Sequence, residues 1–466
     1  MIGIDEGVFK SKLVRRQQQG IFMRRLYAAS FGVAIVALIL LLLTIVNEAF
    51  GYVTLVYKVE PETLTEQPFD ELNREELVTI LITKAPGQLP RLVQMSLTSL
   101  DLQAFAATRL DEALPGKVVS SEFAHLSVKE IPAEQRPVVL GQILTANLDE
   151  AGIRDLIETA ILEPTVAESW PLFEGLLNRK AIEQSLVEKY PDVVTRPELR
   201  FKSWLRGDLL TNSMDANPLL AGVRTALIGT IYLLVIVVLT AFPVGIGAAI
   251  YLEEYADPTR WYNRLIETNI RNLAGVPSII YGMLGLQLLV RFMGERTNGG
   301  LGITSGEILG VTDGTGRNLI AAGLTLGLLV LPVIIINAQE AIRAVPPSFR
   351  EGSYGLGATK WQTIWKTVLP SAMPGIMTGI ILSLSRAVGE TAPLVVVGAS
   401  TYVVQDPTLF SRFTALPIQI YNWTSRPQAG FRELAAGGIV ILLVLLVIIN
   451  AVAFVLRSQA RRRLQS

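Results

Sequence analysis

The sequence contains no cysteine and a single histidine, His125, among its 466 residues. The absence of cysteine excludes disulfides, thiolate nucleophiles, iron–sulfur clusters and cysteine-ligated zinc. One histidine excludes histidine-rich metal sites and most Ser-His-Asp triads. Charged residues are also scarce, at 18% of the chain, whereas 50% of the residues are hydrophobic. Because soluble domains average about 25% charged residues, this composition favours a membrane protein.

The balance of charge changes along the chain. Residues 47–222 contain 16 Lys and Arg and 27 Asp and Glu, a net charge of −11, and the rest of the chain carries +11. The basic part is also the apolar part. This pattern predicts contact with a membrane and not with a nucleic acid.

Six apolar runs are each long enough to cross a bilayer, which takes about 20 residues. The strongest runs, IVALILLLLTIV and IVILLVLLVIIN, have no polar face to give to solvent, which argues against buried helices of a soluble protein. The first run is too long for the apolar core of a cleavable signal peptide. The predicted spans are Leu26–Val46, Ala226–Tyr251, Leu273–Met293, Leu319–Ala338, Met373–Val397 and Ala436–Leu456.

Lys and Arg predict the orientation of these spans. The N-terminus and tail (1–25 and 457–466), with the loops 252–272 and 339–372, carry 17 Lys and Arg, against 5 in the short loops opposite. Positive charge concentrates on the cytoplasmic side of membrane proteins. Both termini are therefore predicted to be cytoplasmic, and residues 47–222 to be extracytoplasmic.

The 47–222 segment is long enough to form a small domain of its own. The β-branched and aromatic run Tyr52–Glu60 predicts a strand. Apolar residues at helical spacing predict a helix over Asp149–Leu162 and a second, surface-lying helix over Arg179–Tyr190. We expect a mixed, mainly helical insert.

The segment Pro346–Pro370 lies between the fourth and fifth predicted spans. Ser348 is followed three residues later by Glu351, and Thr359 is followed in the same way by Gln362. This spacing predicts a capping box at the N-terminus of each of two short helices.

A glycine turn and two tryptophans complete this segment. Gly355 and Gly357 are predicted to break the first helix, and Trp361 and Trp365 follow a helical repeat in the second. Two interpretations remain open. The segment is either an interfacial loop with an aromatic anchor or a docking element that inserts into a partner protein.

The fifth predicted span contains two charged residues, Arg386 and Glu390. They are four residues apart, so on one helix they share a face and could pair. An ion pair that only orients the helix is one interpretation. The other is a transport pathway, because charges inside a membrane usually face a cavity, and the planar guanidinium suits tetrahedral oxyanions.

The 346–370 segment resembles the cytoplasmic loop of ABC-importer permeases, whose pattern is E-A-A-x-x-x-G, nine residues, then I-x-L-P. The chain departs from this pattern at Gly352, Ser353 and Thr367. In that family the loop is a coupling helix that sits in a cleft of an ATPase subunit. The resemblance implies a type I importer core of five helices over residues 223–456, preceded by one N-terminal helix. The ATPase-coupling residues that it implies are Glu351, Gly357, Trp361, Leu369 and Pro370.

Two further motifs resemble phosphate-importer permeases, close to the PstA type. They are Arg386–Leu394, which reads RAVGETAPL, and Gly275–Gly282, which reads GVPSIIYG. The Pro in the second motif is equally well interpreted as a plain helix kink. The resemblance implies a substrate pathway lined by Arg386, Glu390, Thr391, Ser278 and Tyr281.

The resemblance also implies a complex in the bacterial inner membrane. Its members would be this chain, a sister permease of the PstC type, two ATPase subunits and an extracytoplasmic phosphate-binding protein. This chain would be no enzyme and would hold no cofactor, since ATP and Mg would bind the ATPase subunits. Alternative functions are import of molybdate, tungstate or sulfate, or a membrane-anchored sensor whose input domain is residues 47–222. An intramembrane enzyme lacks candidate residues.

Overall fold

The computed structural model describes residues 6–59, 63–65, 72–98, 102–162, 164–189, 199–293, 316–400, 403 and 406–463. Residues 1–5 and 464–466 of the predicted cytoplasmic ends lie outside this range. Five helices are long and apolar enough to cross a membrane, or six if one sharply bent pair is counted as a span. The chain is therefore a mostly helical, polytopic membrane protein with a small sheet in the insert, as the sequence predicts.

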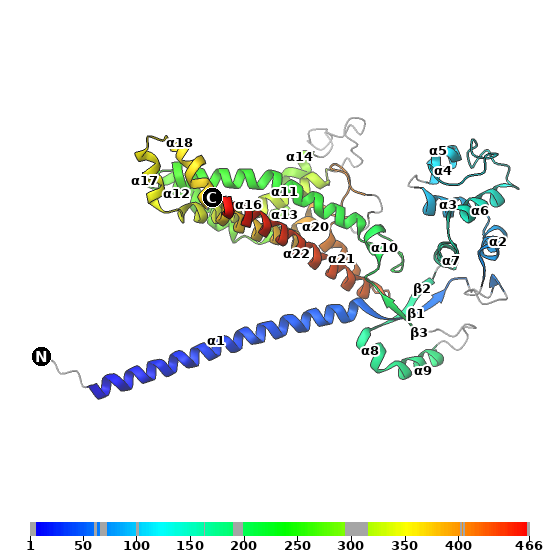
Figure 1. The fold of residues 1–466 in the computed structure, drawn as a ribbon, viewed down its shortest axis with the longest axis horizontal. Helices are drawn as coiled ribbons and strands as arrows, with labels where there is room; N and C mark the ends of the chain where they lie inside the picture. The colour runs from blue at the N-terminus through cyan, green and yellow to red at the C-terminus, as the bar shows by residue number, and fades with distance from the viewer. Residues whose placement is uncertain are drawn as a thin grey trace.

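Four of the predicted spans correspond to single long helices. They are α1 (Glu6–Ala49), α11 (Arg224–Ile250), α16 (Leu319–Arg343) and α22 (Phe431–Arg463). Helix α11 continues into a single wide turn, η4 (Tyr251–Tyr255). Helices α1 and α22 lie close together near the sheet and diverge toward the opposite end of the molecule (Figure 1).

Helix α16 is the central helix of the bundle. In its most apolar window 67% of the residues are buried, against 0% in α1 and 6% in α22. It packs against α11 on one side and α19 (Leu369–Gly389) on the other. Within these windows the side chains of α1 and α22 are therefore left to lipid or to another protein, because this apolar surface has no polar face to give to water.

The prediction of the third span was wrong at its start. Leu273 belongs to α12 (Trp261–Ala274), and the chain then turns by 107° into α13 (Ser278–Gly285), η5 (Leu286–Val290) and α14 (Arg291–Met293). The physical reason is the Gly-Val-Pro sequence at 275–277. Proline has no backbone N–H and disfavours the helical conformation in the residue before it, so α12 ends there.

The prediction of the fifth span was also wrong, at both ends. Helical structure begins with α18 (Lys360–Thr363), passes through η7 (Ile364–Val368) and continues as α19 to Gly389. The chain is extended at Glu390 and resumes as the short helix α20 (Ala392–Val397). The ring of Pro393 would clash with the carbonyl of Gly389 in a continuous helix.

The insert contains one antiparallel sheet of order β2-β1-β3, formed by β1 (Phe50–Tyr57), β2 (Pro164–Pro171) and β3 (Leu199–Ser203). The predicted strand over Tyr52–Glu60 is confirmed as far as Tyr57, where β1 ends, and Glu60 lies outside the described residues. The sheet shares an apolar core with the membrane helices, in which Val53 and Trp204 belong to one cluster with residues of α11, α21 (Leu416–Thr424) and α22. The sheet is therefore fixed to one end of the helical bundle.

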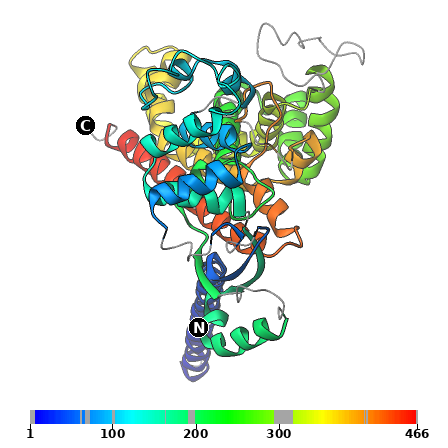
Figure 2. The same cartoon turned by 90° about the vertical axis from the view of Figure 1, so that its right-hand side faces the viewer.

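A group of helices with its own apolar core lies on one side of the sheet, and α8 (Leu172–Leu177) and α9 (Arg179–Lys189) lie on the other (Figures 1 and 2). The predicted helix over Asp149–Leu162 is confirmed, with Asp149 as its N-cap, and the predicted helix over Arg179–Tyr190 is confirmed as α9 as far as Lys189, with Tyr190 outside the described residues. The domain boundaries 47 and 222 stay a prediction. The group consists of α2 (Arg74–Lys84), α3 (Leu89–Leu97), α4 (Leu102–Ala107), α5 (Leu110–Ala113), α6 (Arg136–Asn147), α7 (Glu150–Ile157) and η3 (Glu158–Leu162).

Candidate functional site

The 346–370 segment lies at the end of the bundle opposite the sheet (Figure 1). It forms α17 (Pro347–Gly355) and α18, joined by a turn in which Gly357 has a φ of +83°, so the predicted glycine break is confirmed. The Thr359–Gln362 capping box is confirmed as well. The prediction of a capping box at Ser348 was wrong, because α17 begins one residue earlier, at Pro347, a residue that suits the first helical position.

The second half of the segment presents an aromatic face to its surroundings. Ile364 and Val368 are buried, whereas Trp361 and Trp365 remain 59% and 48% exposed, with ring centroids 5.2 Å apart. Residues four apart share a helix face, so the buried pair anchors the helix and the tryptophan pair points outward. Leu356, in the turn between the helices, is 91% exposed. Exposed apolar clusters of this kind are typical of protein or membrane contacts.

The remaining predicted coupling residues occupy different places in this segment. Glu351 is exposed on α17. Leu369 and Pro370 are half-buried where η7 passes into α19, and Leu369 packs against the core of the bundle. The exposed aromatic face on α18 and η7 is therefore connected to the core of the bundle by helical structure that runs without a break into α19.

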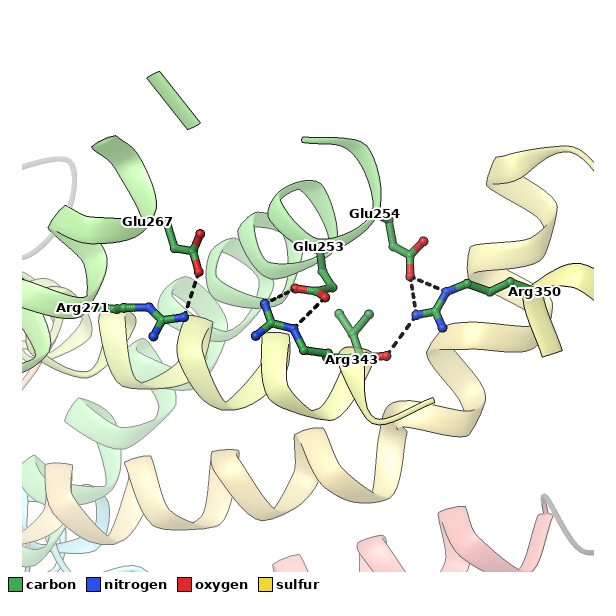
Figure 3. A network of polar contacts seen from close by, with 7 residues as sticks. Glu253, Glu254, Glu267, Arg271, Arg343 and Arg350 are labelled. Carbon is green, nitrogen blue, oxygen red and sulfur yellow. Dashed lines mark hydrogen bonds and ion pairs between the residues drawn. The ribbon is translucent and has the colours of Figure 1, made fainter. Parts of the chain in front are cut away.

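A polar network that the sequence analysis missed holds this segment (Figure 3). Arg350 of α17 donates two hydrogen bonds to Glu254, at 3.0 and 2.7 Å, and one each to the carbonyls of Val345 and Ile342. The side chain of Arg350 is 20% exposed and that of Glu254 is 7% exposed. Such a shielded pair is screened by salt much less than a surface pair.

A second ion pair lies beside the first (Figure 3). Arg343, the last residue of α16, binds both carboxylate oxygens of Glu253, at 2.9 and 2.8 Å. In the sequence, Arg343 and Arg350 are predicted only as positive charges of the cytoplasmic side. One feature of the sequence could have predicted these ion pairs. Two adjacent acids, Glu253 and Glu254, directly follow an apolar span on the predicted cytoplasmic side, where the other loop charges are mostly basic.

The predicted pathway residues Ser278 and Tyr281 both lie on α13. Ser278 is its first residue and is half-buried, and Tyr281 is buried and donates a 2.8 Å hydrogen bond to the carbonyl of Leu273 across the bend. A Cβ atom on Gly282 would lie 2.7 Å from the Cα of Pro393. Helices α13 and α20 therefore lie in close contact. The motifs 275–282 and 386–394, which resemble those of phosphate permeases, meet at this contact.

The predicted pathway residues Arg386, Glu390 and Thr391 lie around the α19–α20 break. Arg386 is exposed in the last turn of α19. Glu390 and Thr391 follow in the break and are half-buried. The prediction that Arg386 and Glu390 share a helix was wrong, and no ion pair or hydrogen bond joins them among the described residues.

The arrangement supplies a cation and a phenol beside an interrupted helix. In a membrane such a cation offsets the desolvation of a passing anion, whereas a helix break is tolerated only where it contacts protein or lines a cavity. Within the part of the chain that the structure describes, no group of three His, Asp or Glu residues is placed to hold a metal ion.

These features define a polytopic membrane protein with an exposed aromatic segment at one end of its helices and a polar break within them. Residues 241–465 match the family described as "Binding-protein-dependent transport system inner membrane component". The chain belongs to this family of transport permeases.

Three relatives illustrate the similarity. The chain is 34% identical over 243 residues to "Phosphate transport system permease protein PstA 1" of Mycobacterium tuberculosis (strain CDC 1551 / Oshkosh), which is 52% of this chain and 72% of that protein. It is 33% identical over 208 residues (43% and 64%) to "Phosphate transport system permease protein PstC" of Haemophilus influenzae. It is 31% identical over 195 residues (42% and 58%) to "Probable ABC transporter permease protein YqgH" of Bacillus subtilis. The chain thus spans between 58% and 72% of these relatives.

Proposed function

We propose that this chain is the permease subunit of an ATP-driven phosphate importer, in which it forms half of the pathway and is no enzyme itself. The observation that carries the proposal is the similarity to two proteins named phosphate transport permeases, over 243 and 208 residues. The exposed Arg386 at the end of α19 supports an anionic substrate. The similarity to both a PstA and a PstC relative fits a chain that pairs with a sister permease of the other type.

The proposed pathway lies between this chain and its sister. Arg386 would offset the charge of a phosphate ion, and its planar guanidinium suits a tetrahedral oxyanion. Ser278, Tyr281 and Thr391 would supply hydroxyl groups, and Glu390 would keep binding weak enough for release.

One of two ATPase subunits would dock against α17, α18 and the exposed pair Trp361 and Trp365, and both subunits would bind ATP and Mg. Glu351, Gly357, Leu369 and Pro370 would form the rest of the coupling segment. ATP-driven closure of these subunits would then move the helices between outward-facing and inward-facing states by rigid-body rotation.

The proposed orientation in a bacterial inner membrane has both termini in the cytoplasm. Its support is the excess of Lys and Arg at that side, together with the position of α17, the start of α1 and the end of α22 at the end opposite the sheet (Figure 1). Residues 47–222 would then face an extracytoplasmic phosphate-binding protein.

Uptake of labelled phosphate by phosphate-starved cells that lack this chain tests the proposal. Complementation with the wild-type chain is expected to restore uptake, and excess molybdate, tungstate or sulfate is expected not to compete. Competition by one of these anions would assign another oxyanion. Phosphate uptake that never depends on the chain would overturn the proposed function.

A further inference from the structure

The two adjacent acids Glu253 and Glu254 bind two different helices. They lie in the wide turn η4, directly after α11. Adjacent residues of a helical turn point in different directions, so Glu253 faces Arg343 at the end of α16 and Glu254 faces Arg350 on α17 (Figure 3). The end of α11 is thereby tied to two elements that are 90 and 96 residues away in the sequence.

Arg350 binds three elements at once. All three of its guanidinium nitrogens donate hydrogen bonds: Nε and Nη2 to Glu254, Nη1 to the carbonyl of Val345, and Nη2 also to the carbonyl of Ile342. Ile342 is in the last turn of α16 and Val345 follows it, where helix carbonyls carry partial negative charge. The rigid fork of arginine presents donors on three nitrogens to acceptors that lie apart, whereas lysine carries its three donors on a single nitrogen.

Helix α17 has little else to hold it. None of its nine residues, all in the described part of the chain, is buried. A helix on the surface normally gains its place from an apolar face packed on the core, and α17 lacks such a face. Besides Arg350, the side-chain link from α17 to its neighbours is a hydrogen bond between Ser353 and Thr363 of α18.

We infer that Arg350 is a positioning residue, which makes α17 move as one piece with the ends of α11 and α16. This inference rests on the proposed function. A push on α17 reaches two spans through the Glu254 carboxylate and the α16 carbonyls. Arg343 and Glu253 reinforce the same joint between α11 and α16. Without Arg350, α17 moves independently of the spans, and ATP is hydrolysed without transport.

The first experiment measures the position of α17 directly and needs no transport. The chain contains no cysteine, so Leu239→Cys on α11 and Leu356→Cys after α17, both at exposed positions, give clean sites for spin labels. We expect the distance distribution between the labels to broaden in Arg350→Gln. The matched control is Arg271→Gln, which breaks an exposed pair with Glu267 on α12 (Figure 3). An unchanged distribution in Arg350→Gln overturns the inference.

The second experiment measures coupling. The complex with its ATPase subunits, reconstituted in liposomes, gives the amount of anion transported per ATP hydrolysed. This ratio is expected to fall at least about tenfold in Arg350→Gln, with ATP hydrolysis and the amount of bound ATPase subunit retained, and to stay at the wild-type value in Arg271→Gln. A wild-type ratio in Arg350→Gln, or a parallel loss of transport and ATPase binding, overturns the positioning role.

Two further outcomes separate the inference from the proposed function. If the wild-type complex transports another oxyanion, the phosphate assignment fails, but the ratio for that anion still tests Arg350. If Arg350→Gln does not accumulate in the membrane, Arg350→Lys keeps the charge and loses the three-way contact. The same broadening and the same fall in ratio are then expected of Arg350→Lys, and wild-type values would overturn the inference.

Discussion

The hydroxyl groups of Ser353 and Thr363 lie 2.9 Å apart and form a hydrogen bond that joins α17 to α18. Thr363 is buried, with 1% of its surface exposed. Ser353 stands where the family pattern has an alanine, which carries no hydroxyl group for such a bond. The hydrogen bond connects the two helices that flank the glycine turn at residues 356–359.

Replacing Ser353 by alanine is expected to loosen this turn. The lost hydrogen bond contributes about 0.5–1.5 kcal/mol, and the buried Thr363 hydroxyl loses a partner. Hydrogen exchange of residues 347–363 in the full chain should become faster, while the spans keep wild-type rates. Ser348→Ala, an exposed serine on the same helix, is the control and should leave exchange unchanged. Equal exchange in the two variants would show that the link carries no stability.

Two glycines of the same segment should respond to alanine in opposite ways. A Cβ atom on Gly352 would meet no atom within 4 Å, whereas Gly357 has a φ of +83° that alanine rarely adopts. Gly352→Ala should therefore raise the stability of α17 by up to about 1 kcal/mol. Gly357→Ala should lower it by about 1–2 kcal/mol.

Hydrogen exchange of α17 in the two purified variants checks this opposition. A faster exchange in Gly352→Ala would contradict the open space seen around it. Thermal unfolding of the whole chain is the weaker measurement, because the large membrane core dominates its midpoint. The comparison also tests whether Gly352, which stands where the family pattern has an alanine, lowers the stability of α17.

The spans were predictable because long apolar runs have one stable solution in lipid, a helix with all backbone groups satisfied. The Thr359 capping box and the Gly357 turn were predictable because both depend on residues close in sequence. The Glu390 break was missed because the apolar run continues through it, and only the clash of Pro393 with the carbonyl of Gly389 ends the helix.

The polar network could not be predicted from local pattern. Glu254 and Arg350 are 96 residues apart, and nothing in either neighbourhood specifies the other. The same holds for Gly282 and Pro393, which lie in motifs that were predicted to matter but not to touch. Local sequence therefore predicted the elements and some caps, and the long-range contacts between them needed the structure.

Gly282→Ala is expected to separate α13 from α20. The new methyl group would lie 2.7 Å from the Cα of Pro393, a backbone atom that cannot rotate away. Overpacking of this kind costs about 1–3 kcal/mol, so the thermal unfolding midpoint of the purified chain should fall. Gly247→Ala on α11, where no atom lies within 4 Å, should leave it unchanged or higher. Equal midpoints would mean that α13 shifts freely, and the proposed pathway would then lack a fixed wall.

Glu130 should make part of the insert sensitive to acid. The backbone N–H of Ser127 donates a 2.7 Å hydrogen bond to its carboxylate, and this bond lowers the pKa of Glu130 below its ordinary value of 4.5. A carboxyl with a lowered folded-state pKa contributes stability above the unfolded pKa and loses it as pH falls through the folded pKa. The backbone amides of residues 120–131 should therefore be less protected against hydrogen exchange below about pH 4.5.

Hydrogen exchange of that segment, compared between variants at each pH, checks the sign. Glu130→Gln should exchange faster than the wild type at neutral pH, and the difference should disappear in acid. Glu134→Gln, an exposed neighbour, should match the wild type at every pH. A difference that persists below pH 3 would mean that the charge of Glu130 is not what holds Ser127.

Arg386 should matter for transport and not for folding. It is exposed in the chain, and it forms no ion pair with Glu390 among the described residues. Arg386→Ala is therefore expected to reach the membrane at wild-type levels while phosphate uptake falls at least about a hundredfold, because a buried anion without its cation loses about 3 kcal/mol or more. Arg386→Lys keeps the charge without the planar fork and should retain partial uptake.

Leu382→Ala is the matched control, an exposed residue one turn earlier on α19. It should transport at the wild-type rate. If Arg386→Ala transports normally, Arg386 lies outside the pathway, and the α19–α20 break has another purpose. If Leu382→Ala fails as well, the face of α19 contacts the sister permease, and loss of uptake at Arg386 would report assembly. Copurification of the sister chain with each variant separates these two outcomes.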